Sequence, residues 1–287
     1  MKDVQFDDIH GLHLPKPLSH KGQNGRLLII GGSHLFHAAS IWALEVASRI
    51  VDLVHYSSVP ENNELVLRAK EQFRDGIVVP RGDIDMYIEE DDCILIGPGM
   101  MRDEDTAVLT HALLTRYPKK QWVIDAGALQ MIRLEDIPER AILTPHHQEF
   151  AGLWEKAVAK TSVFNDAKTD EDKVKAFAKT HHCIVLLKGH VDIACSGSVC
   201  DERVCTPGEL RRISGGNEGM TKGGTGDVLA GLIASLACQN DPMLAVLAGS
   251  FINKQAGDTL YSTVGPFFNA SDLAKQIPMT LRSLFVR

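Results

Sequence analysis

The sequence predicts an α/β protein with a mostly parallel central sheet and helices on both of its faces. The chain has 287 residues, of which 44% are apolar, and this is ample material for a packed core. Short apolar runs bounded by turn residues alternate with segments of helical periodicity, and no internal repeat or long linker interrupts them. Such alternation is typical of right-handed crossovers between parallel strands. We expect one domain, residues 25–287, after an irregular amino-terminal segment, residues 1–24.

Six predicted strands are short and apolar, as strands covered on both faces should be. They are Arg26–Gly31, Val51–Ser58, Cys93–Gly97, Trp122–Asp125, Ala141–Thr144 and Cys183–Lys188. Helical patterns between them cover Ala38–Arg49, Thr106–Arg116, Gln148–Ala159 and Glu171–Thr180. Farther on, Val191–Cys195 and Ser198–Cys205 predict a hairpin that turns at Ser196-Gly197. Two long helices are predicted after it, Asp227–Cys238 and Pro242–Leu260.

Charge and hydropathy exclude several classes of protein. Asp and Glu total 37 against 30 Lys and Arg, and no basic block could neutralise a run of phosphates, so we expect no nucleic-acid partner. The longest useful uncharged run, Val228–Asn240, is shorter than the ~20 residues of a membrane span. The first twenty residues lack the basic-then-apolar order of a signal peptide, and the six cysteines form no C-x-x-C pair. We expect a cytoplasmic protein with no membrane partner.

The most informative segment is the glycine loop, residues 215–227, which has six glycines in thirteen residues and leads into a helical pattern. Free backbone N–H groups with a helix amino terminus behind them form an anion site. The segment is not a Walker A loop, because no Lys-Ser or Lys-Thr pair follows its last glycine. Asp227 either caps the helix or takes a proton from an attacking hydroxyl. Lys188 and His146, also at strand ends, favour the second role.

Other polar residues and glycines follow predicted strands, and ligands of a parallel sheet bind outside the carboxyl ends of its strands. Lys188-Gly189 closes one strand, where the lysine either reaches a phosphate as a point charge or is simply solvated. His146 and Glu149 lie where another strand gives way to a helix. The segments 97–99 and 125–129 follow two further strands.

A dinucleotide fingerprint of the hydride-transferring enzymes is not present. Gly31-Gly32-Ser33 follows a strand, but the third glycine of that motif is missing and no acidic residue ends the next strand. Classical hydride transfer is therefore disfavoured.

Six motifs, taken in their order along the chain, resemble the ATP- or ADP-dependent NAD(P)H-hydrate dehydratases, which belong to the ribokinase-like superfamily. The motifs are NGRLLIIGGS, ILIGPGM, WVIDAGAL, AILTPHHQEF, IVLLKG and GNEGMTKGGTGDVLAGLIA. The resemblance spans about Asn24–Asp258, and the ordered set is far more specific than any one motif. It implies a ribokinase-like three-layer α/β/α sandwich.

The resemblance also implies roles for particular residues. The glycine loop that ends at Gly226 would bind the nucleotide phosphates, and Asp227 would be the catalytic base. The nucleotide-binding positions are Lys188, Gly189, His190, Val191, Asp192, Gly223, Gly224, Thr225 and Gly226. The positions that hold hydrated NADH or NADPH are Ala39, Gly99, His146 and Asp227. The implied cofactors are ATP or ADP and Mg²⁺, and we assign no residue as a metal ligand.

The implied reaction repairs a damaged cofactor. The nucleotide phosphorylates a hydroxyl that water has added to the reduced nicotinamide ring, and phosphate then leaves as the ring double bond re-forms. Positioning and electrostatic stabilisation would be the tasks of the protein. We expect a homo-oligomer, and we expect the epimerase domain that is often fused amino-terminally in this family to be absent, since 287 residues leave no room for it.

The segments on the acceptor side depart from the family pattern, whereas the phosphate side is intact. His34–Ala39 replaces a Tyr, Pro, Gly, Ala run, and Ser48–Asp52 replaces a glycine-rich step. His147-Gln148 stands where Pro-Gly is common, and Met100-Met101 replaces a glycine-containing turn. One alternative is therefore a ribokinase-like kinase for a hydroxyl of a vitamin precursor or sugar. Another is an inactive nucleotide-binding protein, against which the retained Asp227 argues.

Overall fold

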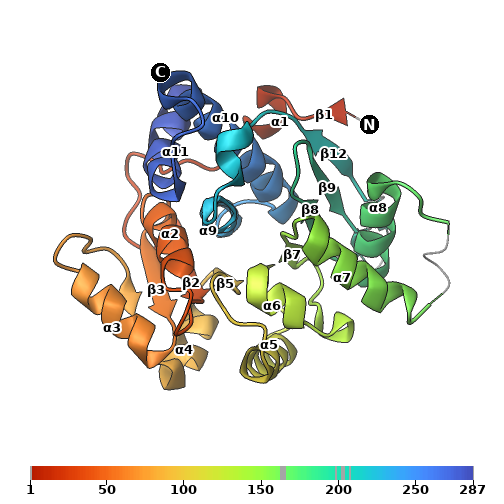
Figure 1. Cartoon of the computed structure of the whole chain (residues 1–287), viewed down its shortest axis with the longest axis horizontal. Helices are drawn as coiled ribbons and strands as arrows, with labels where there is room; N and C mark the ends of the chain where they lie inside the picture. Colours follow the sequence, from red (N-terminus) through yellow and green to blue (C-terminus); the bar gives the residue numbers. More distant parts are fainter. Residues whose placement is uncertain (1, 162–165, 198, 202–203, 207, 287) are drawn as a thin grey trace.

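The computed structural model describes residues 2–161, 166–197, 199–201, 204–206 and 208–286. It contains a ten-stranded sheet with helices packed on both of its faces (Figure 1). The prediction of an α/β fold with a mostly parallel sheet is confirmed. No helix within these ranges combines the length and the apolar character needed to cross a lipid bilayer.

The strands of this sheet are short. In chain order they are β1 (Lys2–Asp3), β2 (Arg26–Ile30), β3 (Leu53–Ser57), β4 (Ile77–Val78), β5 (Cys93–Ile96), β6 (Gln121–Ile124), β7 (Ile142–Leu143), β8 (Ile184–Leu187), β9 (Asp192–Ser196) and β12 (Leu210–Ile213). From edge to edge the order is β1-β12-β9-β8-β7-β6-β5-β2-β3-β4. β9 is antiparallel to its neighbours β8 and β12, and the other pairs are parallel.

Two layers of helices enclose the sheet. One face is covered by α2 (Ala38–Ala47), α9 (Thr225–Ala237), α10 (Pro242–Val264) and α11 (Ala270–Phe285). The other is covered by α4 (Ile84–Glu90), α5 (Glu104–Arg116), α6 (Ala126–Met131), α7 (His147–Val158) and α8 (Asp170–His181). The short α1 (Phe6–Ile9) lies beside α10, and α3 (Pro60–Ala69) flanks the β4 edge.

The two layers explain why the central strands are continuously apolar. Leu27 and Ile29 of β2 point into the core under α2 and α9, whereas Leu28 and Ile30 point into the core on the opposite face. Because successive side chains of a strand alternate between faces, a strand that is covered on both sides needs apolar residues throughout. The six predicted strands are therefore found where the sequence places them.

The predicted hairpin after residue 190 is wrong in its pairing. β9 pairs with β8 and with β12, so it belongs to the main sheet. The residues that follow form a separate small sheet from β10 (Val199–Asp201) and β11 (Val204–Thr206), while Ser198 lies outside the described residues. The four buried residues Asp192–Cys195 explain the difference, because an apolar strand is more stable between two neighbours inside the sheet than in an exposed hairpin.

The amino-terminal segment is more ordered than the sequence predicts. β1 pairs in parallel with β12, and α1 follows it. Val4, Ile9 and Leu12 are buried in the core. A strand of two residues and a helix of one turn are too short to give a periodic pattern in the sequence. The prediction of an irregular segment over residues 1–24 therefore misses them. The division of the chain after residue 24 stays a prediction.

Candidate active site

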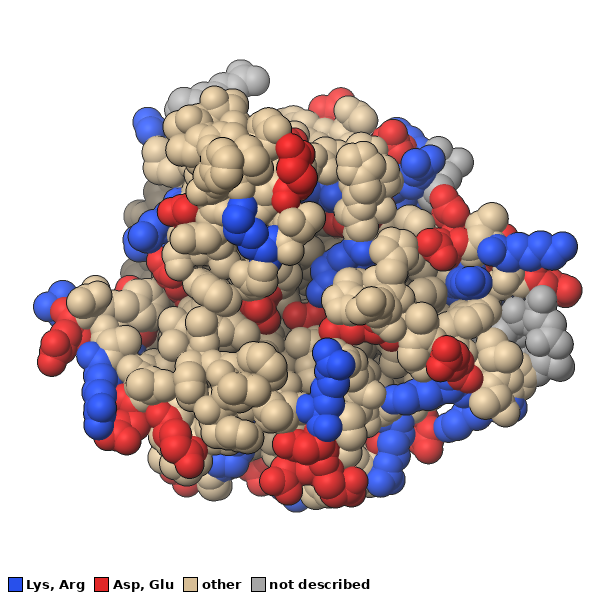
Figure 2. Space-filling view, viewed as in Figure 1, with Lys and Arg blue, Asp and Glu red and all other residues tan. Residues whose placement is uncertain are grey.

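The carboxyl ends of five neighbouring parallel strands, β8, β7, β6, β5 and β2, lie side by side at one end of the sheet. The amino terminus of α9 lies next to these strand ends. The predicted site residues follow these strands or begin the helices after them. Figure 2 shows acidic and basic side chains meeting in a hollow near the middle of the corresponding face of the molecule. The fold thus gathers residues that are far apart in the sequence at the place where ligands of parallel sheets bind.

Lys188 is held among these strand ends. It follows β8, and its backbone N–H donates to the Pro145 carbonyl over 2.8 Å. Its Nζ donates to Asp125 Oδ1 over 2.9 Å, and the Thr144 hydroxyl donates to the same oxygen over 2.8 Å. Burial alone would lower the pKa of Lys188, but the carboxylates of Asp125 and Glu149 raise it, and the net direction is upward. Lys188 therefore remains a cation in a site that is largely shielded from water.

Asp227 occupies the first turn of α9 and is half-buried. The pKa of its carboxyl is raised from 3.8 to about 7, chiefly because burial disfavours the charged form. Asp125 adds to the rise and Lys188 opposes it. A carboxyl with a pKa near neutrality can accept a proton and release it again, which is the property that a general base needs.

The glycine loop carries the amino terminus of α9 into the site. Gly224 is the residue before the helix, with φ of 97°, and a Cβ there would collide with the Trp42 ring. The first intrahelical bond is donated by Val228 to the Gly224 carbonyl, so the N–H groups of Gly226 and Asp227 have no acceptor within the helix. These groups and the helix dipole provide the predicted anion site.

Two other predicted residues of this loop differ in what they offer. The Thr225 hydroxyl donates to the carbonyls of Met220 and Lys222 over 2.7 and 2.9 Å, so it stabilises the loop from within. Gly223 is exposed, and a Cβ added there would meet nothing within 4 Å. A Cβ on Gly226 would lie 3.5 Å from Lys188 Nζ. The end of the glycine loop and the lysine side chain are therefore neighbours.

The turn between β8 and β9 holds the other predicted nucleotide-binding residues, from Gly189 to Asp192. Asp192 is buried, and its carboxylate accepts from the Gly189 N–H over 2.9 Å and from the Ser250 hydroxyl over 2.7 Å. Lys254 Nζ lies 3.3 Å from the same carboxylate. Asp192 thus shapes the turn. His190 is exposed and Val191 is half-buried.

Lys254 ties this turn to the glycine loop. Its Nζ donates to the carbonyls of Gly189, His190 and Gly215 over 3.1–3.2 Å, and its side chain is only 7% exposed. The two loops that would enclose a nucleotide are therefore fastened to one buried lysine of α10.

His146 is the residue before α7 and begins a capping box. Its Nδ1 accepts from the Glu149 N–H over 3.2 Å, and its own N–H donates to Glu149 Oε2 over 2.9 Å. Because Nδ1 is an acceptor here, a neutral His146 carries its proton on Nε2. The ring is half-exposed, so this second nitrogen can donate to a ligand.

Ala39 and Gly99 lie against each other on the other side of the site. A Cβ added to Gly99 would lie 3.0 Å from the Ala39 Cβ and 2.8 Å from the Phe36 carbonyl oxygen. Gly99 has φ of +73°, a conformation that favours glycine. The Gly32 N–H donates to the Pro98 carbonyl over 2.7 Å and fixes the loops after β2 and β5 together.

Three residues of this region were not predicted as site residues. Asp125 directly follows a buried strand and Glu149 lies in the first turn of a helix. A carboxylate directly after a buried strand is the sequence signal that marks Asp125. Lys254 lies in the middle of a long helix, where an isolated lysine gives no signal.

A family model described as NAD(P)H-hydrate dehydratase matches residues 27–279. The chain belongs to the NAD(P)H-hydrate dehydratase family. The match extends from β2 into α11 and contains all the site residues described above.

Two curated relatives illustrate the range of this dehydratase family. The ADP-dependent (S)-NAD(P)H-hydrate dehydratase of Nitrosopumilus maritimus is 33% identical over 93% of this chain and 92% of its own length. The bifunctional NAD(P)H-hydrate repair enzyme of Methanocaldococcus jannaschii is 33% identical over 97% of this chain but only 52% of its own length. The chain thus spans about half the length of the bifunctional relatives that it matches.

Solved structures confirm the ribokinase-like fold of this dehydratase family member. A ribokinase-like superfamily protein of Enterococcus faecalis has a TM-score of 0.82 at 22% identity, over 99% of this chain and 96% of its own. The ADP/ATP-dependent NAD(P)H-hydrate dehydratase of Bacillus subtilis, co-crystallized with ATP and Mg²⁺, has a TM-score of 0.80 at 22% identity, over 99% and 98%.

Proposed function

We propose that this chain dehydrates hydrated NADH and NADPH in a reaction driven by ATP or ADP. The observation that carries the proposal is the position of Asp227 in the first turn of α9, next to Gly226, whose added Cβ would lie 3.5 Å from Lys188 Nζ. Burial raises the pKa of the Asp227 carboxyl to about 7. A carboxylate beside an anion site would repel the phosphate unless it has a task there. Accepting the proton of a hydroxyl that attacks the phosphate is such a task. Membership of the dehydratase family supports the same reaction.

The first step is phosphoryl transfer. The N–H groups of Gly226 and Asp227 bind the terminal phosphate, with Lys188 beside it as a fixed positive charge. The ring hydroxyl gives its proton to Asp227, its oxygen forms a bond to phosphorus, and the bond to the bridging oxygen breaks. The shortened nucleotide leaves with the electron pair of that bond.

The second step is elimination. The carbon–oxygen bond of the phosphate ester breaks, the neighbouring ring carbon gives a proton to water, and the electron pair of that carbon–hydrogen bond forms the ring double bond. Phosphate departs with the electron pair of the broken bond, which it accommodates far better than hydroxide could. The reduced dinucleotide is then restored.

The residues present fit Mg²⁺, because carboxylate oxygens are its preferred protein ligands and Asp125 and Glu149 bring them close to Lys188. No group of three carboxylate, histidine or cysteine ligands stands together in the described parts of the chain. We therefore propose that nucleotide phosphates and water complete the coordination, with Asp125 and Glu149 contributing directly or through water. When bound, the ion neutralises charge on the transferred phosphoryl group.

On the acceptor side we propose that His146 donates from Nε2 to the hydrated nicotinamide. Ala39 is partly exposed and would contact the ring directly, whereas Gly99 is buried against Ala39 and would shape the pocket from behind it. A cytoplasmic location and association into a homo-oligomer complete the proposal. The oligomer is tested by light scattering of the purified chain, where a monomer at all concentrations would contradict it.

The decisive experiment follows the absorbance of the reduced nicotinamide while the protein acts on hydrated NADH with Mg²⁺ and ATP or ADP. We expect the absorbance to return only when protein and nucleotide are both present. The other outcome is that absorbance does not return but ATP is consumed with a small alcohol such as a thiazole or a sugar. In that case the changed acceptor-side segment His34–Ala39 has altered the substrate specificity of the pocket. The protein is then a small-molecule kinase.

A further inference from the structure

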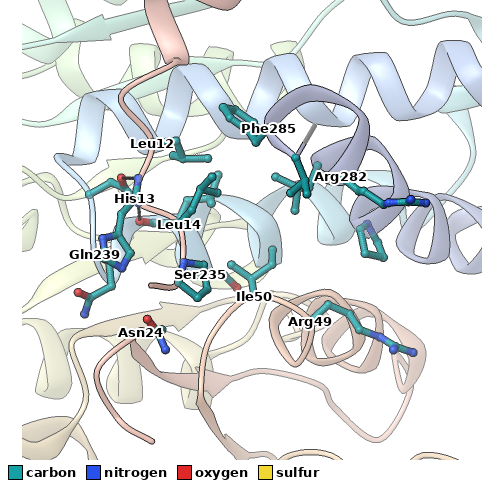
Figure 3. Close-up of a pocket in the computed structure, with 16 residues that line it drawn as sticks. Leu12, His13, Leu14, Asn24, Arg49, Ile50, Ser235, Gln239, Arg282 and Phe285 are labelled. Carbon is teal, nitrogen blue, oxygen red and sulfur yellow. Dashed lines mark hydrogen bonds between the residues drawn. The ribbon is translucent and has the colours of Figure 1, made fainter. Parts of the chain in front are cut away.

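A cavity of about 240 Å³ lies at the opposite end of α2 and α9 from the active site (Figure 3). It is enclosed by residues 12–15 of the amino-terminal segment and by the carboxyl ends of α2, α9 and α11. Asn24 also lines it, so five separate stretches of the chain contribute to its wall. The active site uses the amino-terminal ends of α2 and α9 instead, so the cavity is a distinct feature of the molecule.

The walls of the cavity are mostly apolar. Leu12, Leu14 and Ile50 approach it from the amino-terminal segment and from the end of α2, and Leu281 and Phe285 approach it from α11. Concave, apolar surfaces with a few well-placed polar groups are typical of sites for small organic molecules.

One polar atom in the wall has no partner. His13 Nε2 is buried and makes no hydrogen bond within the described residues. The backbone of His13 is fixed, because its N–H donates to Asn240 Oδ1 over 2.7 Å. The hydroxyl of Ser235, another lining residue, is already used, since it donates to the Gly231 carbonyl over 2.7 Å. This nitrogen exposes almost no surface, so it is closed off from the cavity and offers no contact to a ligand there.

The charges around the cavity are all of one sign. Arg49 and Arg282 line it, and Figure 3 shows their side chains extending along the same side. Both are exposed, and neither forms an ion pair in the parts of the chain that the structure describes. No Asp or Glu lines the cavity, although the chain has 37 of them. Helix dipoles favour a cation at each of these helix ends, but they do not explain an apolar cavity between the two arginines.

We propose that this cavity binds a small amphipathic organic anion. Its aromatic or branched aliphatic body fills the space between Leu12, Ile50 and Phe285, and its acidic group lies toward Arg49 and Arg282. Charge complementarity selects an anion over a neutral or cationic molecule of the same shape.

The test uses 8-anilinonaphthalene-1-sulfonate, a fluorescent anion of this class, with the whole chain. We expect saturable binding of one equivalent, undiminished by ATP and Mg²⁺, which would occupy the nucleotide site. The double variant Arg49→Ala/Arg282→Ala should weaken binding roughly tenfold, as expected for the loss of two exposed charge contacts. The double variant Arg49→Lys/Arg282→Lys should retain most of the affinity.

A matched control removes the same amount of charge elsewhere. Arg74 and Arg133 are exposed and far from the cavity lining, so Arg74→Ala/Arg133→Ala should bind the probe as the wild type does. Thermal melts without probe verify that each variant is folded. Displacement of the probe by ATP, or equal affinity in the Arg49→Ala/Arg282→Ala variant and the wild type, would overturn the proposal.

Discussion

Lys188 interacts more strongly with the carboxylate of Asp125 than with that of Asp227. Its hydrogen bond goes to Asp125, which also accepts from Thr144. For Asp227, burial and the charge of Asp125 both raise the pKa, and the attraction of Lys188 lowers it less than these two effects raise it. The arrangement separates the two acids by role, because one anchors the lysine and the other can exchange a proton near neutral pH.

Replacement of the base should remove turnover and leave nucleotide binding intact. In Asp227→Asn the shape of the side chain is kept and its basicity is lost, so we expect kcat to fall by roughly 10²- to 10⁴-fold. ATP affinity, measured by titration, should change little. In the wild type, kcat/KM should fall as the pH drops below about 7, because protonated Asp227 cannot accept a proton. Near-wild-type turnover in the variant would leave Asp227 as a helix cap.

The pH profile should also respond to Asp125. The Asp125 charge raises the pKa of Asp227, so Asp125→Asn lowers it, and Lys188, released from its partner, lowers it further. We expect the acidic limb of the kcat/KM profile to move to lower pH. Thr144→Val is the control, since it removes a hydrogen bond to Asp125 but leaves its charge. An acidic limb that stays in place in Asp125→Asn would show that these carboxyls are not coupled.

His146 should matter for one substrate only. If its Nε2 donates to the hydrated dinucleotide, His146→Ala raises the KM for that substrate and leaves the KM for ATP nearly unchanged. The neighbouring His147 is exposed and lies 3.5 Å from Asp170, so His147→Ala serves as the control. Equal effects of the two substitutions in steady-state kinetics would contradict a specific role for His146.

The start of α9 depends on glycines that have different tasks. Gly226→Ala adds a Cβ whose nearest neighbour is Lys188 Nζ at 3.5 Å, so we expect the fold to tolerate it. The methyl group would, however, intrude on the proposed phosphate position. We expect ATP affinity to fall roughly tenfold or more with little change in Tm. Gly82→Ala is the control, since it also has open space around its Cβ but lies outside the glycine loop, and it should change neither quantity.

Gly224→Ala completes this comparison by affecting the fold first. Its positive φ and the Trp42 ring leave no room for a side chain, so we expect a loss of more than about 1–2 kcal/mol in the free energy of unfolding. Thermal and denaturant unfolding without nucleotide measure this loss. Equal Tm values for the alanine variants at 224 and 226 would contradict the assignment of different tasks.

The sequence predicts the elements whose signals are local and strong. Continuous apolar runs such as Ile184–Leu187 identify the buried strands, and the glycine loop identifies the start of α9. β4 and β1 have two residues each and show no periodicity. The pairing of β9 depends on neighbours that are distant in sequence. For the same reason, the contact between Lys188 and Asp125 cannot be found from spacing, because 63 residues separate them.

The site has a consequence for the stability of the whole molecule. Folding raises the pKa of Asp227 from 3.8 to about 7, so between these pH values the folded chain binds more protons than the unfolded chain. Stability contributed by this residue is therefore lost as the pH rises through this window. Asp227→Asn should raise the Tm at pH 8 by an amount that corresponds to at most about 4 kcal/mol, and less at pH 5. Differential scanning calorimetry at both pH values tests this, and a lower Tm at pH 8 would contradict it.

The two edges of the sheet decide how copies of this chain can meet. β1 and β4 have two residues each, so either edge offers another chain very few backbone hydrogen bonds. Fibre growth by stacking of strands is therefore disfavoured, even though the ten-stranded sheet is rich in β-branched residues. Backbone pairing between sheet edges is thus a poor route for an assembly of several copies, and contacts between side chains would have to select the partner.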